Sequence, residues 1–313
     1  MLCLYFFIGR TKANIRMECE DNNHEEADTL LIHQAVLASR RSSPNTELMD
    51  FSPDTDVLVL LIGHYDILLN STSITMKSGV LQIGSMWTFL GASRAKALPG
   101  FHAFTGTDNT SRFSGIGKVT WLNIFLEAPE EIWKALQQLS EPDEVTEEQI
   151  SILEKFVCHA YRPKKSDITN IPDLRWYLFC KNMSDSEKLP PTIGALKQHI
   201  LRAKIQARVW GQASVAQQSL PEPLGNGYCR TKDGQLQPLA PELLPAPEAI
   251  LEMVRCLCKT NCSTKRCSCA AVNLPCTEIC QCTSDCQNDQ DSKDVSSNLI
   301  DSESDDDDDT DDD

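Results

Sequence analysis

Hydrophobic and polar positions divide the first part of the chain into short segments of two kinds. From residue 25 to about residue 126, apolar runs alternate with turn residues, which is typical of a chain that alternates helices and strands. Ala27–Ala38 has helical spacing, whereas the continuous apolar run Val57–Ile62 has the length of a strand buried on both faces. Val80–Ile83 is short enough to be another strand. We therefore expect an α/β fold with a mostly parallel sheet covered by helices.

The pattern becomes helical from Pro129 to about Gln217. Apolar residues recur there every three or four positions, and acidic residues begin several of these stretches, as they do in the first turns of helices. The stretch from Leu220 to Pro247 is rich in proline and glycine, which is typical of a linker. The sequence thus predicts an α/β domain, a helical extension, a linker, a cysteine-rich module and an acidic tail, at residues 18–128, 129–217, 218–249, 250–288 and 289–313.

The cysteine-rich module contains nine of the fourteen cysteines of the chain. They are Cys256, Cys258, Cys262, Cys267, Cys269, Cys276, Cys280, Cys282 and Cys286. The odd number argues against a closed set of disulfides, and thiolates at this density favour a soft tetrahedral cation, which indicates zinc. Nine thiolates satisfy about three tetrahedral zinc ions if some of them bridge two ions. The sequence therefore predicts a zinc cluster.

This cysteine pattern resembles the tesmin-type CXC domain, a DNA-binding module. The matching pieces are Cys256-Leu257-Cys258, Lys265-Arg266-Cys267-Ser268-Cys269, Leu274-Pro275-Cys276, Cys280-Gln281-Cys282 and Cys286-Gln287-Asn288. The resemblance implies a nine-cysteine, three-zinc cluster that contacts DNA. The family usually has two copies where this chain has one, and often has an aromatic residue where this chain has Arg266.

Charge limits how this module can hold DNA. Zinc ions compensate only part of the thiolate charge, so the cluster itself is net negative. Contact with phosphate must come from the neighbouring cations, because the affinity gained from counterion release scales with the number of cations engaged. These are Arg255, Lys259, Lys265 and Arg266, and Arg266 has the side chain suited to a narrow minor groove. The alternatives are a metal staple for a segment too small to bury a core, and a protein-docking module.

The charge of the whole chain is dominated by its C-terminal end. The formal net charge is −16, and residues 301–313 alone contain ten acidic residues and no cation. Self-repulsion in such a low-complexity segment predicts disorder. The tail competes with DNA for the basic residues, binds histones or is only solvated, and the composition leaves these three interpretations open.

Two bulk properties bear on where the protein acts. No apolar stretch approaches the ~20 residues that a membrane-spanning helix needs. The thiol-rich zinc pattern indicates a reducing compartment. We therefore expect no membrane partner, DNA or chromatin as the partner, and location in the nucleus or, failing that, the cytoplasm.

Three acidic motifs occur in the α/β region. They are Glu25-Glu26-Ala27-Asp28, Ser52-Pro53-Asp54-Thr55-Asp56 and Gly106-Thr107-Asp108, and the last is followed by Gly115-Ile116-Gly117-Lys118. Carboxylates near the ends of strands suit one or two Mg²⁺ or Mn²⁺ ions. Two such ions can activate a water and stabilise the leaving oxygen in phosphodiester cleavage. The alternative is turn and helix-cap chemistry, in which the same residues are common.

The order of these motifs resembles the flap-endonuclease-like branch of the PIN nucleases. The resemblance implies that Glu26, Asp28, Asp54, Asp56 and Asp108 bind two catalytic metal ions. It also implies that Gly115, Gly117 and Lys118 hold a phosphate of the nucleic acid, consistent with amides at a helix N-terminus. The family's first strand ends in a metal-binding aspartate that has no counterpart in residues 1–24. We expect either that this strand belongs to a portion missing from the chain or that the domain is a non-catalytic relative.

Two functions therefore follow from the sequence. The first is a metal-dependent DNA endonuclease-like domain tethered to a zinc DNA-binding module. The second is a non-enzymatic DNA or chromatin adaptor that keeps a degenerate nuclease fold as a scaffold. The six histidines have no metal-ligand spacing, and we expect them to be core or surface residues.

Overall fold

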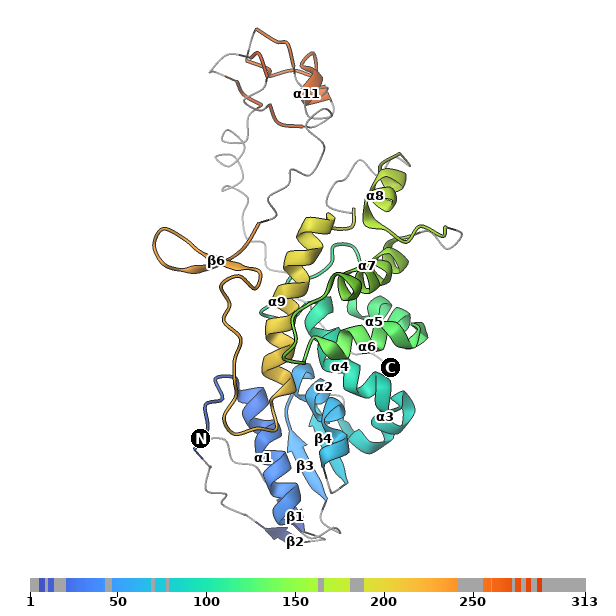
Figure 1. Cartoon of the computed structure of the whole chain (residues 1–313), viewed down its shortest axis with the longest axis vertical. Helices are drawn as coiled ribbons and strands as arrows, with labels where there is room; N and C mark the ends of the chain where they lie inside the picture. The colour runs from blue at the N-terminus through green and yellow to red at the C-terminus, as the bar shows by residue number, and fades with distance from the viewer. Residues whose placement is uncertain are drawn as a thin grey trace, which may run out of the picture. The chain divides into compact units, whose positions relative to one another are not determined.

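The computed structural model describes residues 6–8, 11–13, 21–42, 47–68, 71–76, 79–162, 166–180, 189–240, 256–259, 261–271, 274–276, 280–282 and 286–288. The chain divides into two compact units, Met1–Glu242 and Leu243–Asp313, and each is described by itself. Figure 1 labels the helices and strands along the chain. The acidic motifs belong to the first unit and the cysteine-rich module belongs to the second.

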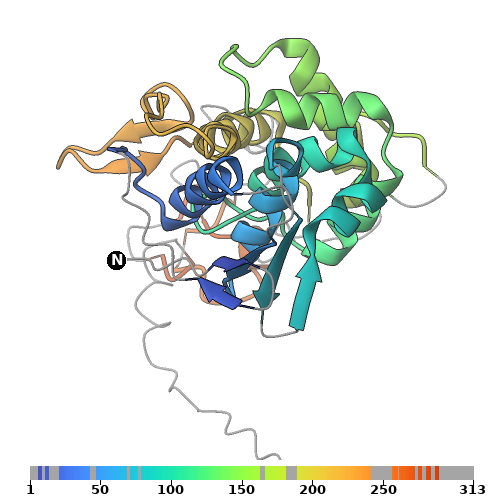
Figure 2. The same ribbon diagram turned by 90° about the horizontal axis from the view of Figure 1, so that it is seen from below.

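A small mixed sheet lies in the first unit. Strand β3 (Leu48–Phe51) pairs parallel with β4 (Thr72–Met76), and β4 pairs antiparallel with β5 (Gly79–Gln82). Figure 2 shows these strands with helices packed on one side of them. The α/β class is thus confirmed in outline. The expected mostly parallel sheet is not confirmed, because the described strands of this sheet make one parallel and one antiparallel pairing.

Two further strand pairs occur in the described part of the first unit. Strands β1 (Phe6–Ile8) and β2 (Thr11–Ala13) form one antiparallel pair, and β6 (Tyr228–Arg230) and β7 (Leu236–Pro238) form the other. The second pair lies within the segment that composition marks as a linker, so part of that segment has regular structure.

Most of the first unit is helical. Its helices are α1 (Ala27–Arg41), α2 (Thr55–Gly63), the short 3₁₀ helix η1 (Tyr65–Ile67), α3 (Ile83–Leu90), α4 (Ala92–Thr105), α5 (Lys118–Glu127), α6 (Glu130–Gln138), α7 (Glu147–Tyr161), α8 (Ile171–Cys180) and α9 (Ile193–Gly211). The helix expected at Ala27–Ala38 and the helical region from Pro129 onward are confirmed. The strand expected at Val80–Ile83 is confirmed as β5, one residue earlier.

The apolar run Val57–Ile62 was expected to be a buried parallel strand, and that prediction is wrong. The run forms the interior of α2, and Val57, Leu60, Leu61 and Ile62 are all buried. The Asp54 side chain accepts a hydrogen bond of 2.9 Å from the Asp56 backbone amide, which caps the helix. A short apolar run fits a buried helix as well as a buried strand, so the cap decides between them.

One hydrophobic core in the first unit contains buried residues from α1 to the end of α9. It includes Leu31 of α1 and Ala213, which follows α9, so the predicted α/β region and helical extension bury their apolar residues together. Helix α4 packs against α2, α6 and α9 and is the central element. None of the described helices combines the length and the hydropathy that crossing a membrane requires.

Aromatic side chains fill the middle of this core. The Phe104, Trp121 and Phe156 rings pack together with centroids 5.1 to 6.3 Å apart. His199 lies edge-on to Phe104 and its Nε2 is 2.7 Å from the Phe104 carbonyl oxygen. Burial lowers the pKa of His199 to about 4, so the imidazole is neutral at physiological pH. This histidine is a core residue, as expected.

Candidate functional site

Helix N-termini and one loop position the five acidic residues of the predicted site. Glu26 immediately precedes α1 without a capping hydrogen bond from its side chain, and Asp28 lies in the first turn of α1. Asp54 caps α2, and Asp56 lies in the first turn of α2. Asp108 lies in the loop after α4. The partial positive charge of a helix N-terminus favours carboxylates at these positions. The preference of helix N-termini for carboxylates therefore accounts for the positions of four of the five residues in the chain.

The pKa of Asp28 indicates that the five carboxylates lie near one another. Burial first, and then the charges of Asp54, Asp56, Glu26 and Asp108 in that order, together raise this pKa from 3.8 to about 6. Three segments far apart in the sequence thus converge on a common region. Such a cluster is electrostatically unfavourable until a cation or a proton reduces its charge.

The spacing of the carboxylates is wider than that of a preformed metal cage. Among the described residues, the groups whose metal-binding atoms all lie within 4.8 Å of one another consist of cysteines only. Three of the five acidic residues, Asp54, Asp56 and Asp108, line a pocket of about 820 Å³. Carboxylates facing a pocket from separate elements can approach a shared cation by side-chain rotation. The arrangement is suited to hard cations held by a few carboxylates and water.

Glu26 is held by neutral donors from distant parts of the chain. Gln206 Nε2 donates to its two oxygens at 2.9 and 3.2 Å, and Trp210 Nε1 donates to Oε2 at 3.0 Å. Asn109 Nδ2 donates to Oε1 at 3.4 Å. Gln206 and Trp210 both lie on α9, so this helix fixes the orientation of the Glu26 carboxylate. The sequence motifs do not reveal these partners.

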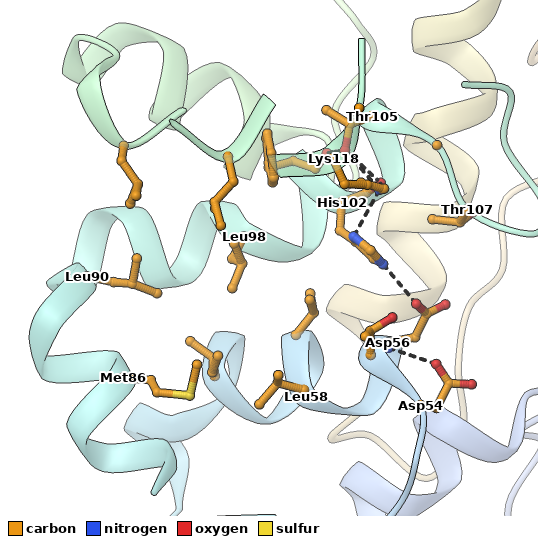
Figure 3. Close-up of a pocket in the computed structure, with 18 of the residues that line it drawn as sticks. Asp54, Asp56, Leu58, Met86, Leu90, Leu98, His102, Thr105, Thr107 and Lys118 are labelled. Atoms are coloured by element: carbon orange, nitrogen blue, oxygen red, sulfur yellow. Dashed lines mark hydrogen bonds and ion pairs between the residues drawn. The ribbon is translucent and has the colours of Figure 1, made fainter. Parts of the chain in front are cut away.

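His102 connects an acidic residue of the pocket to a lysine (Figure 3). Its Nε2 lies 2.8 Å from Asp56 Oδ1 and its Nδ1 lies 3.0 Å from Lys118 Nζ. Because an ammonium group only donates, Nδ1 accepts and the Nε2 hydrogen is donated to Asp56. The ring also stacks on Trp210, with centroids 5.7 Å apart. His102 was expected to be an ordinary core or surface residue, and no spacing motif marks it.

Lys118 does not present its ammonium group freely to the pocket. Besides Nδ1 of His102, its Nζ donates to the His102 carbonyl oxygen at 3.2 Å and to Thr105 Oγ1 at 3.0 Å. These bonds use all three N–H donors of the ammonium group. Burial lowers the pKa of Lys118 to about 8, with Asp56 opposing the shift and Arg112 adding to it. The expected phosphate contact would require Lys118 to exchange one of these partners.

The two glycines of the same motif are more accessible. Gly115 has φ +75°, which favours glycine, and a Cβ there would meet no atom within 4 Å. Gly117 caps α5 and lines the pocket, and its surroundings are equally open. The backbone at the start of α5 is therefore free of steric cover, as an amide site for an anion requires.

The second unit brings all nine predicted cysteines into one cluster. Six are buried and three are partly buried against them. Three groups of four sulfur atoms have all their members within 4.8 Å: Cys256, Cys267, Cys269 and Cys276; Cys256, Cys258, Cys262 and Cys267; and Cys256, Cys262, Cys276 and Cys282. Groups of four thiols match the tetrahedral coordination of zinc, so the cluster can bind zinc.

Four cysteines are shared between these groups, as thiolates that bridge two zinc ions would be. Cys256 belongs to all three groups, and Cys262, Cys267 and Cys276 each belong to two. Burial and neighbouring thiols, with Cys280 first among them, raise the pKa of Cys269 to about 12. For Cys267 burial also raises the pKa, but hydrogen bonds from the Ala270 and Cys269 amides and from the Cys262 and Cys256 thiols together outweigh it and lower the pKa to about 6. Joint ionisation of such crowded thiols requires a compensating cation.

Asn288 links segments of the cysteine cluster, and three basic residues of the described part of this unit are exposed. Asn288 Nδ2 donates to the Leu274 carbonyl oxygen at 2.9 Å, which ties together two segments of the cluster. Lys259, Lys265 and Arg266 are exposed. Arg255 and the acidic tail lie outside the described residues.

The chain was compared with known proteins by sequence and by structure. No family model, no curated protein and no solved structure matches it. The resemblances to CXC domains and to PIN nucleases therefore rest on the motifs alone, whereas the capacity for zinc rests on the sulfur geometry.

Proposed function

We propose that the first unit hydrolyses phosphodiester bonds of DNA with Mg²⁺ or Mn²⁺ and that the second unit is a zinc module that contacts DNA or chromatin. The observation that carries the proposal is the convergence of five carboxylates from three distant segments around Asp28. Turn and cap chemistry accounts for each acidic pair alone, but it does not account for their convergence.

The residues divide into ligands and groups that orient them. Asp54, Asp56 and Asp108 face the pocket, and Glu26 and Asp28 stand beside them. Bound metal ions would supply Lewis acidity toward the scissile phosphate and an activated water. His102 holds the Asp56 carboxylate at 2.8 Å, and α9 holds that of Glu26. The open backbone at Gly115 and Gly117 suits a phosphate of the bound strand.

In this proposal the zinc module is the part of the protein that binds DNA or chromatin and so brings the nuclease domain to its substrate. Its exposed cations, Lys259, Lys265 and Arg266, stand next to a cluster that can bind zinc. Three cations give a modest, salt-sensitive affinity for phosphate. A nuclear location follows from this role, with histones as further partners if the acidic tail binds them.

The proposal is tested with the purified full chain and end-labelled single-stranded and duplex oligonucleotides. Mn²⁺ or Mg²⁺ is compared with Ca²⁺, because a chelator would also remove zinc from the cysteines. We expect cleavage with Mn²⁺ or Mg²⁺ only, and a loss of at least about 100-fold in the Asp54→Asn/Asp56→Asn variant. Asp233→Asn, in the exposed β6–β7 turn, is the matched control and keeps full activity.

A non-enzymatic DNA or chromatin adaptor is the second candidate. Two observations favour it: Lys118 has all three donors engaged within the protein, and the carboxylates are not gathered within 4.8 Å. It is supported if wild type binds DNA but cleaves none under any of these conditions. Replacing Lys265 and Arg266 by alanine should then lower the slope of log K against log salt by about two.

A further inference from the structure

The loop after α4 carries Asp108 between two threonines that fix the loop to its helix. Thr110 is buried, and its Oγ1 donates to the Ala103 carbonyl oxygen of α4 at 2.8 Å and accepts the Thr107 amide hydrogen at 2.9 Å. Thr107 lines the pocket on the side of Asp54 (Figure 3). The position of the loop is therefore set by α4.

The side chain of Asn109, the residue after Asp108, connects this loop to Glu26. Its Nδ2 donates to Gln206 Oε1 at 2.9 Å, and Gln206 Nε2 donates to the two Glu26 oxygens at 2.9 and 3.2 Å. The direct contact from Asn109 Nδ2 to Glu26 Oε1 is longer, at 3.4 Å. Asn109 therefore acts on Glu26 mainly through Gln206.

The direction of these hydrogen bonds decides which end of Gln206 meets the carboxylate. A carboxamide has one accepting oxygen and one donating nitrogen, so the Asn109 donor holds Oε1 and leaves Nε2 for Glu26. In the opposite orientation Oε1 would face the carboxylate, and two acceptors would repel each other. Gln206 is only 5% exposed, so water has little access to supply the missing donor.

The β6–β7 hairpin also holds Asn109. The Tyr228 hydroxyl donates to the Asn109 carbonyl oxygen at 3.3 Å. The hairpin is seated closely on α9, where Arg202 Nη1 donates to the Gly227 carbonyl oxygen at 3.2 Å. A Cβ on Gly227 would lie 2.7 Å from both Arg202 Cγ and the Gln198 carbonyl oxygen. The backbone and the side chain of Asn109 thus contact separate elements, which gives its carboxamide a fixed position.

We propose that Asn109 is a positioning residue of the acidic site: through Gln206 it orients the Glu26 carboxylate so that Glu26 and Asp108 bind the same divalent cation. This inference rests on the proposed function and adds a positioning residue to it. The donors from α9 to Glu26 are a neutral amide and an indole, so they direct the carboxylate without neutralising it. The charge of Glu26 therefore remains for the cation.

Mn²⁺ binding by the full chain tests this inference without nucleic acid. Each protein is first loaded with zinc, and free Mn²⁺ is then measured from its electron paramagnetic resonance signal during a titration. The Asp54→Asn/Asp56→Asn variant defines the Mn²⁺ that other carboxylates bind, including the ten acidic residues among residues 301–313. That amount is subtracted to give the Kd of the acidic site.

Asn109→Ala is compared with Gln206→Met, with the double variant and with Asn123→Ala, which removes an exposed carboxamide of α5 that does not line the pocket. We expect Asn109→Ala to raise the Kd about 10-fold and Gln206→Met about 10- to 100-fold, as for other residues that orient metal ligands. The double variant should stay within about twofold of Gln206→Met, because residues that act in series are not additive. Asn123→Ala should stay within about twofold of wild type. An unchanged urea midpoint for Asn109→Ala separates positioning from loss of the fold.

The outcomes separate this inference from the proposed function. An unchanged Kd for Asn109→Ala, or additive losses in the double variant, overturns the inference, and the nuclease proposal then stands if wild type cleaves DNA. The expected pattern of Kd values in a chain that cleaves nothing supports the inference and refutes the nuclease. If wild type binds no more Mn²⁺ than Asp54→Asn/Asp56→Asn, both fail.

Discussion

Asp50 is a buried carboxyl that opposes folding at neutral pH. It lies on β3 opposite Ile74 of β4 and is only 5% exposed. Among the described groups its Oδ2 has no hydrogen-bond partner. Burial raises its pKa from 3.8 to about 6, and a hydrogen bond from the Phe51 backbone amide offsets part of that shift. The folded state therefore binds this proton more tightly than the unfolded state does.

The sign and size of the effect follow from that difference in pKa. The tighter proton binding of the folded state contributes fully to stability below pH 3.8. This contribution is lost as the pH rises through about 6, because the folded state must then hold a buried charge. The difference between a pKa of 3.8 and one of about 6 lowers the free energy of unfolding by about 3 kcal/mol at pH 7.5 and by about 1 kcal/mol at pH 4.5. Asp50→Asn keeps the shape and removes the ionisation, so it should stabilise the protein by about these amounts.

Urea unfolding of the full chain at both pH values measures this prediction. Tryptophan fluorescence reports on the first unit, which contains all five tryptophans of the chain. Asp233→Asn, which removes an exposed carboxylate from the β6–β7 turn, should change the free energy of unfolding by less than about 0.5 kcal/mol at either pH. A gain from Asp50→Asn that is the same at both pH values, or a loss at pH 7.5, would refute the reasoning.

Two more predictions concern the zinc cluster and the helix packing. Cys256→Ser should remove at least one zinc ion per chain by elemental analysis, because Cys256 belongs to all three sulfur groups, whereas exposed Cys180→Ser should keep the wild-type ratio. Gly100→Ala should cost about 1–3 kcal/mol in urea unfolding, since its Cβ would lie 2.0 Å from the Leu136 carbonyl oxygen. Gly117→Ala, where nothing lies within 4 Å, should cost less than about 1 kcal/mol, and a larger loss there would contradict the packing argument.

Local signals predicted much of the fold. Helical spacing located α1 and the helices from Pro129 onward, where tertiary packing agrees with local preference. The run Val57–Ile62 misled because apolar residues at every position suit any element buried on all sides. Asp54 carried the missing signal, since an aspartate directly after Ser52-Pro53 is a favourable helix cap.

The candidate sites were predictable to different extents. The cysteines are close in sequence, so their clustering followed from spacing alone. The acidic residues were found by motif, but their partners were not. His102, Gln206 and Trp210 reach the carboxylates through packing of α4 and α9, which no local pattern encodes. The inward orientation of Lys118 likewise depends on Thr105 and His102 of another helix.

The hold of α9 on Glu26 also has a consequence for synthesis of the protein. Gln206 follows Glu26 by 180 residues. At about 5–20 residues per second, a ribosome adds that much chain in about 10 to 40 s. Once Asp108 has been added, the nascent chain carries all five carboxylates but still lacks the α9 donors, Gln206 and Trp210, that orient the first of them. The acidic site is therefore completed late in translation, and a chain interrupted before α9 would contain every acidic motif without the geometry they share.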